Sequence, residues 1–242
     1  MRTLIKRLAA CLLLGLGLVF GGGLLQAEDA QAGSRIGIIG TGNIGSALAR
    51  LWVDAGHQVL ISSRHPEQLQ ALAAELGPRA RAGTPQEAAA FGEVVLLAVP
   101  YGAMPQIGRE HAAALAGKVV LDAGNPIPAR DGAMAEEARR LGAGLASQGY
   151  LPGVRLVRAF NAIAAFNLRS QAHRRGDRLA IPLAGDDGEA LQVAAQLVTD
   201  AGFDPVIVGP LSSAKRFDYG SGISAKMLTA PELRRELGLQ AP

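Results

Sequence analysis

The chain has 242 residues, 49% of them hydrophobic and 4% aromatic, enough for one sizeable core built mainly from Ala, Val, Leu and Ile. Its 24 Lys and Arg residues face 21 Asp and Glu residues and are scattered among them, which argues against the clustered basic patch of a nucleic-acid-binding protein. The single cysteine, Cys11, excludes an internal disulfide and a cysteine-based metal site, and the four histidines show no metal-ligand spacing.

The first 32 residues have the organisation of a secretory signal. Residues 1–7 are short and basic, residues 8–25 are an apolar run, and Ala30-Gln31-Ala32 has the small-x-small form of a cleavage site. We therefore expect export to the periplasm with cleavage after Ala32. Two alternatives stay open. The apolar run is long enough to remain as a membrane anchor, or the true start codon lies downstream and the protein is cytoplasmic.

Short strands and helices alternate from residue 34 onward. Residues 35–40 form an apolar strand that ends in glycine, and a helix with one apolar face follows over residues 43–55. Further strands are expected over residues 58–62, 93–99 and 118–122, and further helices over residues 66–76, 86–91 and 101–115. The alternation predicts an α/β domain with a doubly wound parallel sheet over residues 34–126.

The pattern is looser after Pro126. Strands are expected over residues 155–160, 179–184 and 204–208, and a helix over residues 188–201, which Asp186-Asp187 would cap at its N-terminus. Residues 127–242 are therefore predicted to be a smaller C-terminal α/β extension that completes the substrate site. The segment after Gly209 contains Ser212, Ser213, Lys215 and Arg216, for which a polar loop and an anion site are both open interpretations.

A glycine-rich turn connects the first strand to the first helix. Its sequence is Gly40-Thr41-Gly42-Asn43-Ile44-Gly45. In this context Gly40 allows the tight turn, Gly42 lets backbone approach a pyrophosphate and Gly45 lets the helix pack on the strand. The phosphates would then meet free N–H groups at the positive end of the helix. The turn predicts a dinucleotide site.

The second strand ends in Ser62-Ser63-Arg64-His65, where an NAD site has an acidic residue about twenty positions past the glycines. A carboxylate would repel a 2′-phosphate, whereas a hydroxyl and a guanidinium donate hydrogen bonds to it. The segment therefore favours NADP(H) over NAD(H). Asp122 also lies at a strand end, where solvation at the sheet edge or capping of the next turn is a better interpretation than acid catalysis.

Several short motifs in a fixed order now point to a family. IGIIGTGNIGSALA, the SSR after the second strand, LLAVPYGAM, VVLDAGNPIP, VRAFNAI, PLAGDD and VGPLSS resemble the NADP oxidoreductases dependent on coenzyme F-420, a deazaflavin. They also resemble the reductase domain of the ferric-reductase Steap proteins. The resemblance covers residues 35–213 and implies a Rossmann-like NAD(P)-binding fold and a dimer. The tail KRFDYGSGI, residues 215–223, departs from the apolar helix usual in the family.

The resemblance implies roles for individual residues. Thr41, Asn43 and Ile44 would contact phosphates, and Ser63 and Arg64 would hold the 2′-phosphate. The ribose and nicotinamide would be lined by Val99, Pro100 and Tyr101 and closed off by Asn125 and Pro126. The second substrate would face Asn161, Ile163, Gly209, Pro210 and Leu211.

The sequence thus predicts an NADP(H)-dependent oxidoreductase that passes hydride to a small-molecule redox acceptor, a flavin or coenzyme F-420. Direct transfer needs positioning and no catalytic side chain or metal. Two alternatives stay open, namely a reductase of a small carbonyl or imine and a non-catalytic NADP-binding sensor or subunit. A membrane partner is expected only if the N-terminal segment is uncleaved.

Overall fold

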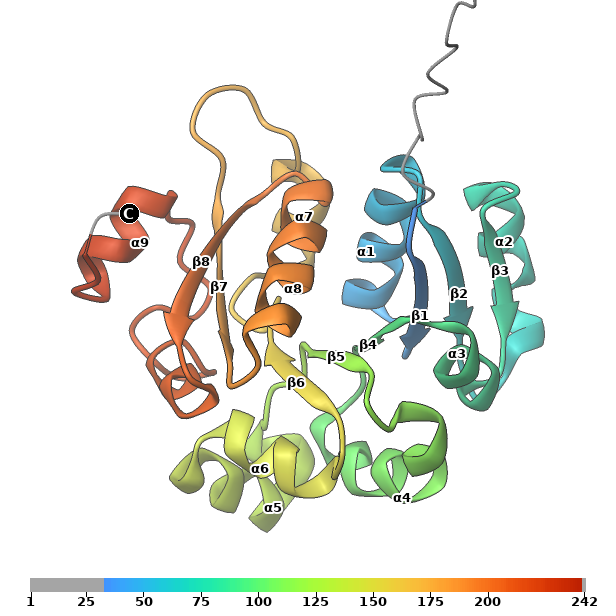
Figure 1. Cartoon of the computed structure of the whole chain (residues 1–242), viewed down its shortest axis with the longest axis horizontal. Coiled ribbons are helices and arrows are strands. Elements are labelled where there is room, and N and C mark those ends of the chain that lie inside the picture. Colours follow the sequence, from blue (N-terminus) through green and yellow to red (C-terminus); the bar gives the residue numbers. More distant parts are fainter. Residues whose placement is uncertain (1–32, 241–242) are drawn as a thin grey trace, which may run out of the picture. The chain divides into compact units, whose positions relative to one another are not determined.

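The computed structural model describes residues 33–240, and in these residues one sheet has the strand order β3-β2-β1-β4-β5-β6-β7-β8 (Figure 1). The predicted signal, residues 1–32, lies outside the described residues. The strands are β1 Arg35–Ile39, β2 Gln58–Ser62, β3 Ala80–Gly83, β4 Val94–Leu97, β5 Val119–Asp122, β6 Arg155–Arg158, β7 Ala180–Gly185 and β8 Asp204–Gly209. Among the described helices, none is both long and apolar enough to cross a membrane.

Strand β1 pairs in parallel with β2 on one side and with β4 on the other. The chain therefore winds outward in one direction through β2 and β3 and in the other through β4, β5 and β6. The doubly wound parallel sheet predicted from the sequence is confirmed for these six strands. In such a sheet the crevice at the reversal point, beyond the carboxyl ends of β1 and β4, is where ligands bind.

Strand β7 runs antiparallel to β6, which the alternating pattern did not predict, and β8 is parallel to β7. Only two residue pairs join β6 to β7, and they lie at the end of each strand. The rest of β7 continues past Arg158, beyond the carboxyl edge of β6. The C-terminal extension thus adds its strands to the same sheet, and the described residues 33–240 belong to one compact unit.

Two layers of helices cover the sheet. One hydrophobic cluster contains Ile36 and Ile38 of β1, and a second cluster on the opposite face contains Ile39, as the alternation of side chains along a strand requires. The first cluster includes residues of α1 Asn43–Asp54, α2 Gln70–Leu76, α7 Ala165–Gln171 and α8 Gly188–Asp200. The second includes residues of α3 Pro85–Phe91, α4 Met104–Leu115, α5 Pro128–Leu141 and α6 Ala143–Tyr150.

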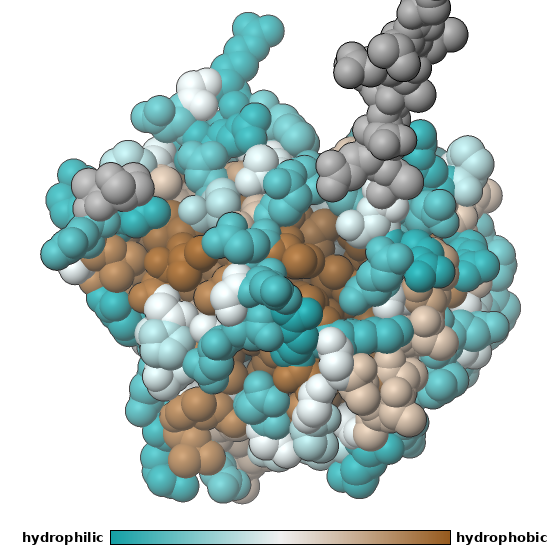
Figure 2. Space-filling model, in the orientation of Figure 1, coloured by the Kyte–Doolittle hydropathy of each residue, from teal (hydrophilic) through white to brown (hydrophobic). Residues whose placement is uncertain are grey.

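A third, smaller cluster packs the C-terminal segment against β7 and β8. It includes Phe217, Ile223 and Leu233, and the segment carries the short helix η3 Leu211–Arg216 and helix α9 Ala230–Glu236. The remaining short helices are η1 Pro66–Leu69 and η2 Tyr101–Ala103. In the view of Figure 1, hydrophobic residues lie at the centre of the visible surface with polar residues around them (Figure 2). The C-terminal segment is therefore a folded part of this unit.

Candidate functional site

The glycine turn is an open cradle of backbone at the N-terminus of α1. Gly40 has φ +96°, which side chains other than glycine rarely adopt. A Cβ on Gly45 would lie 2.1 Å from the carbonyl oxygen of Gly40, so only glycine lets α1 approach the turn this closely. Gly42, in contrast, has nothing within 4 Å of its would-be Cβ and forms no side-chain cap. The open N–H groups and the helix dipole fit a pyrophosphate.

The three residues between the glycines have different surroundings. Thr41 Oγ1 donates a hydrogen bond of 3.0 Å to the carbonyl oxygen of Ser62, so its side chain joins the turn to β2. Ile44 is half-buried and packs on the core, whereas Asn43 is exposed. The phosphate contacts predicted for Thr41 and Ile44 would therefore have to be made by their backbone N–H groups.

Beyond β2, at the predicted 2′-phosphate site, Arg64 has no side-chain partner among the described residues. Ser62 is buried and donates to the carbonyl oxygen of Ile38, while Ser63 Oγ accepts from the backbone N–H of His65. His65 Nδ1 lies 3.5 Å from a carboxylate oxygen of Glu67. Arg64 is exposed and makes no side-chain hydrogen bond or salt bridge within residues 33–240. Its five donors are thus available to a phosphate.

The loop after β4 lies at the carboxyl edge of the sheet beside β1. Val99 is half-buried and Pro100 exposed, as a lining role requires. Tyr101 requires a correction, because its side chain is fully buried and its hydroxyl donates to the carbonyl oxygen of Ala143 at 2.9 Å. Burial raises the pKa of this phenol above its ordinary value. Only the backbone of Tyr101 is left to face a coenzyme.

Asp131, which the sequence analysis did not single out, joins the loop after β4 to the loop after β5. One carboxylate oxygen accepts from the backbone N–H of Gly102 after β4, and the other accepts from the N–H of Ile127 after β5. Burial opposes its ionisation, but these bonds and the neighbouring Arg130 lower the pKa of Asp131 below its ordinary value. Arg130 also donates to the carbonyl oxygen of Asn125 at 2.7 Å. The available signal was an acidic residue in the first turn of a helix that begins with proline.

A buried ionic triad lies beneath this edge, at the ends of β5 and β6. Arg158 is fully buried between Asp122, 2.9 Å away, and Asp218, 2.8 Å away. The guanidinium also donates to the carbonyl oxygen of Gly124, and Asp122 accepts from the N–H of Gly124. Burial disfavours the charge on Arg158, but the two carboxylates outweigh it and raise its pKa. The predicted turn capping by Asp122 is confirmed, whereas solvation is wrong because the side chain is inaccessible.

The residues predicted to face the second substrate differ in their burial. Asn161 is buried and donates to Asp218, and its carbonyl oxygen accepts from the side chain of Asn125 at 2.8 Å. Ile163 packs partly on the core, and Leu211 is buried in the second hydrophobic cluster, so the side chain of Leu211 cannot face a ligand. Gly209 and Pro210, at the end of β8, keep some exposure.

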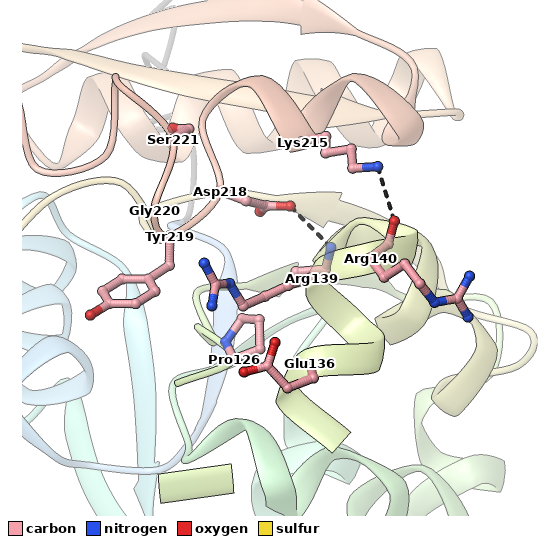
Figure 3. Close-up of a pocket in the computed structure, with 10 residues that line it drawn as sticks. Pro126, Glu136, Arg139, Arg140, Lys215, Asp218, Tyr219, Gly220 and Ser221 are labelled. Carbon is pink, nitrogen blue, oxygen red and sulfur yellow. Dashed lines mark hydrogen bonds between the residues drawn. The ribbon is translucent and has the colours of Figure 1, made fainter. Parts of the chain in front are cut away.

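A cavity of about 440 Å³ lies beyond Pro126, between helices α5 and α6 and the tail (Figure 3). We call it the tail cavity. Pro126 is the one residue of the predicted coenzyme and second-substrate sites that lines it, and Lys215, named above for a possible anion site, lines it as well. The other lining residues are Glu136, Arg139, Arg140, Ala143, Asp218, Tyr219, Gly220 and Ser221. The part of the tail that departs from the family pattern therefore forms one wall of the cavity.

Comparison with known proteins finds similarity to NADP-dependent oxidoreductases. The model of the family described as "NADP oxidoreductase coenzyme F420-dependent" matches residues 35–126. The metalloreductase STEAP3 of Rattus norvegicus is 30% identical over 199 residues, which are 79% of this chain and 37% of the rat protein. The chain thus spans little more than a third of this relative. The resemblance to both groups of reductases that the motifs indicated is confirmed.

Solved structures show the same fold. A hypothetical protein from Sinorhizobium meliloti matches with a TM-score of 0.68 and 28% identity, over 81% of this chain and 95% of the other. A protein from Arthrobacter sp. FB24, provisionally described as an F420-dependent NADP reductase, matches with a TM-score of 0.65 and 24% identity, over 76% and 88% of the two chains. The Rossmann-like fold expected from the sequence is confirmed.

Proposed function

We propose that this oxidoreductase transfers hydride from NADPH to a flavin or deazaflavin. The observation that carries the proposal is the position of Pro126, which follows the end of β5 and also lines the tail cavity. A coenzyme lying along the carboxyl edge from Arg64 past the glycine turn brings its nicotinamide to this loop. A ring bound in the cavity then lies beside it.

The residues at the carboxyl edge of the sheet suit the binding of NADPH and would hold it in a fixed position. The open N–H groups around Gly42 suit the pyrophosphate, and the free guanidinium of Arg64 suits the 2′-phosphate. Asp131 holds the loops after β4 and β5 at a fixed separation. Holding two reactants in contact is the main contribution to a reaction that needs no covalent help from the protein.

The reaction balances with a single solvent proton. A hydride leaves C4 of the nicotinamide with its electron pair, a bond forms to N5 of a flavin or C5 of a deazaflavin, and a proton from water completes the reduced ring. NADPH is oxidised to NADP⁺ and the acceptor is reduced by two electrons. Reduction of a carbonyl or imine would instead require a proton donor in contact with the substrate.

The test is anaerobic oxidation of NADPH by the full-length protein, followed at the nicotinamide absorbance band. FMN, FAD, riboflavin and coenzyme F-420 are added separately, and NADH replaces NADPH as the control. Oxidation that requires a flavin or deazaflavin and prefers NADPH supports the proposal. Oxidation triggered instead by small carbonyl or imine compounds, or tight NADPH binding with no oxidation by any acceptor, overturns it.

A further inference from the structure

The tail cavity combines segments that are far apart in the chain. Helix α5 contributes Glu136 and Arg139, and the segment from Lys215 to Ser221 faces them (Figure 3). Gly220 has φ +86°, and a Cβ built on it would lie 3.2 Å from a terminal nitrogen of Arg139. The guanidinium therefore lies directly against the tail.

Cations outnumber free carboxylates in this cavity. Lys215 Nζ donates to the carbonyl oxygen of Arg140 at 3.0 Å, close to the C-terminus of α5. The side chain of Arg139 makes no hydrogen bond or salt bridge within residues 33–240. Of the two acidic residues present, Asp218 is committed to Arg158 and to the backbone N–H of Ala143. Glu136 is then the one carboxylate that opposes these cations, so the cavity favours an anion.

The direction of each side chain separates Arg139 from its neighbour. In Figure 3 the guanidinium of Arg139 points toward Tyr219, whereas that of Arg140 points to the opposite side. Arg140 meets the cavity through the carbonyl oxygen that Lys215 binds. Arg139 is thus the uncommitted cation that a ligand would meet.

Tyr219 adds a flat aromatic surface. Its side chain is 43% exposed, although large hydrophobic side chains are generally buried. Aromatic rings bind planar heterocycles by stacking and pair with guanidinium groups. The cavity therefore presents a stacking surface and a free cation, with Pro126 linking it to the nicotinamide loop.

We propose that the tail cavity selects an acceptor that carries a phosphate, with Arg139 binding the phosphate and Tyr219 contacting the ring. This rests on the proposed function and specifies the substrate class, a phosphorylated flavin or deazaflavin in place of the neutral riboside. Lys215 adds a second positive charge near the same anion. The size of the cavity is within the range of small-molecule sites, about 300–1,000 Å³.

The test compares FMN with riboflavin, which has the same ring and no phosphate. For the full-length protein we expect a lower KM for FMN than for riboflavin. Arg139→Gln should raise the KM for FMN about tenfold or more, the effect of losing a hydrogen bond to a charged group, and leave that for riboflavin unchanged. Arg140→Gln is the matched control. It also removes one positive charge, but the side chain of Arg140, the next residue in the chain, points away from Tyr219.

Binding of FMN measured without NADPH separates the proposed phosphate site from the proposed hydride transfer. FMN bound to the full-length protein is followed by the polarisation of its fluorescence, with inorganic phosphate as competitor. An unchanged melting temperature and an unchanged KM for NADPH show that Arg139→Gln is folded. Equal KM values for FMN and riboflavin, or equal effects of Arg139→Gln and Arg140→Gln on the KM for FMN, overturn the inference and leave the proposed hydride transfer unaffected. Arg139-dependent FMN binding without NADPH oxidation supports the site and overturns the transfer.

Discussion

Replacement of Arg64 by Ala tests the proposed 2′-phosphate site directly. Arg64 is exposed and has no side-chain partner within the described residues, so its removal breaks no internal contact and should leave the melting temperature unchanged. The loss on binding is that of hydrogen bonds to a charged phosphate, about 1.5–3 kcal/mol. This corresponds to an increase of about 10- to 150-fold in the Kd for NADPH.

The assay is a calorimetric titration of the protein with NADPH and with NADH, which lacks the 2′-phosphate. We expect the Arg64→Ala variant to lose affinity for NADPH alone. Arg79→Ala is the matched control, because Arg79 is also exposed and precedes β3 at the opposite edge of the sheet. Equal losses for NADPH and NADH, or equal losses in the two variants, would refute the assignment of Arg64.

Three further predictions concern the glycine turn, the ionic triad around Arg158, and Asp131, which joins the loops after β4 and β5. Gly45→Ala should lower the free energy of unfolding by about 1–3 kcal/mol, since its Cβ would meet backbone at 2.1 Å, whereas Gly42→Ala should keep the melting temperature and weaken NADPH binding. Arg158→Met leaves two buried carboxylates unpaired and should cost about 3–5 kcal/mol in urea denaturation; a loss under 1 kcal/mol would contradict the triad. Because the pKa of Asp131 is lowered in the folded protein, its ionised carboxylate stabilises the fold at a pH above the ordinary pKa of about 4. This contribution is lost as the pH falls through the folded-state pKa. The free energy of unfolding of Asp131→Asn should therefore fall less between pH 5 and 3 than that of the unchanged protein.

Local signals located the elements that carry strong patterns. The apolar run of β1 stops at Gly40, and β4 is buried on both faces, so both were predictable as strands. Asp187 caps α8 through the N–H of Ala190, as its position before a helical pattern indicated. These features depend on a few consecutive residues and therefore leave a clear mark in the sequence.

Weak or short patterns were missed. Helix α5 is mostly polar on its outer face and contains Gly132 with φ +58°, so its hydrophobic periodicity is interrupted. Helix α6 has two glycines in eight residues, and β3 is a four-residue edge strand with an exposed arginine. The antiparallel direction of β7 could not be predicted, because a buried strand has the same residue pattern in either direction.

The sequence alone determined the local features of the predicted coenzyme site. The dihedral angle at Gly40, the open helix start at Gly42 and the cation at Arg64 are each set by a short segment, because a turn between adjacent elements depends on its own residues. Only the tertiary structure decided the other half. It buried Tyr101 and Leu211, placed Arg158 between two carboxylates, and brought helix α5 against the tail to form a cavity. Such contacts join residues distant in the chain, and packing across the sheet determines which of them meet.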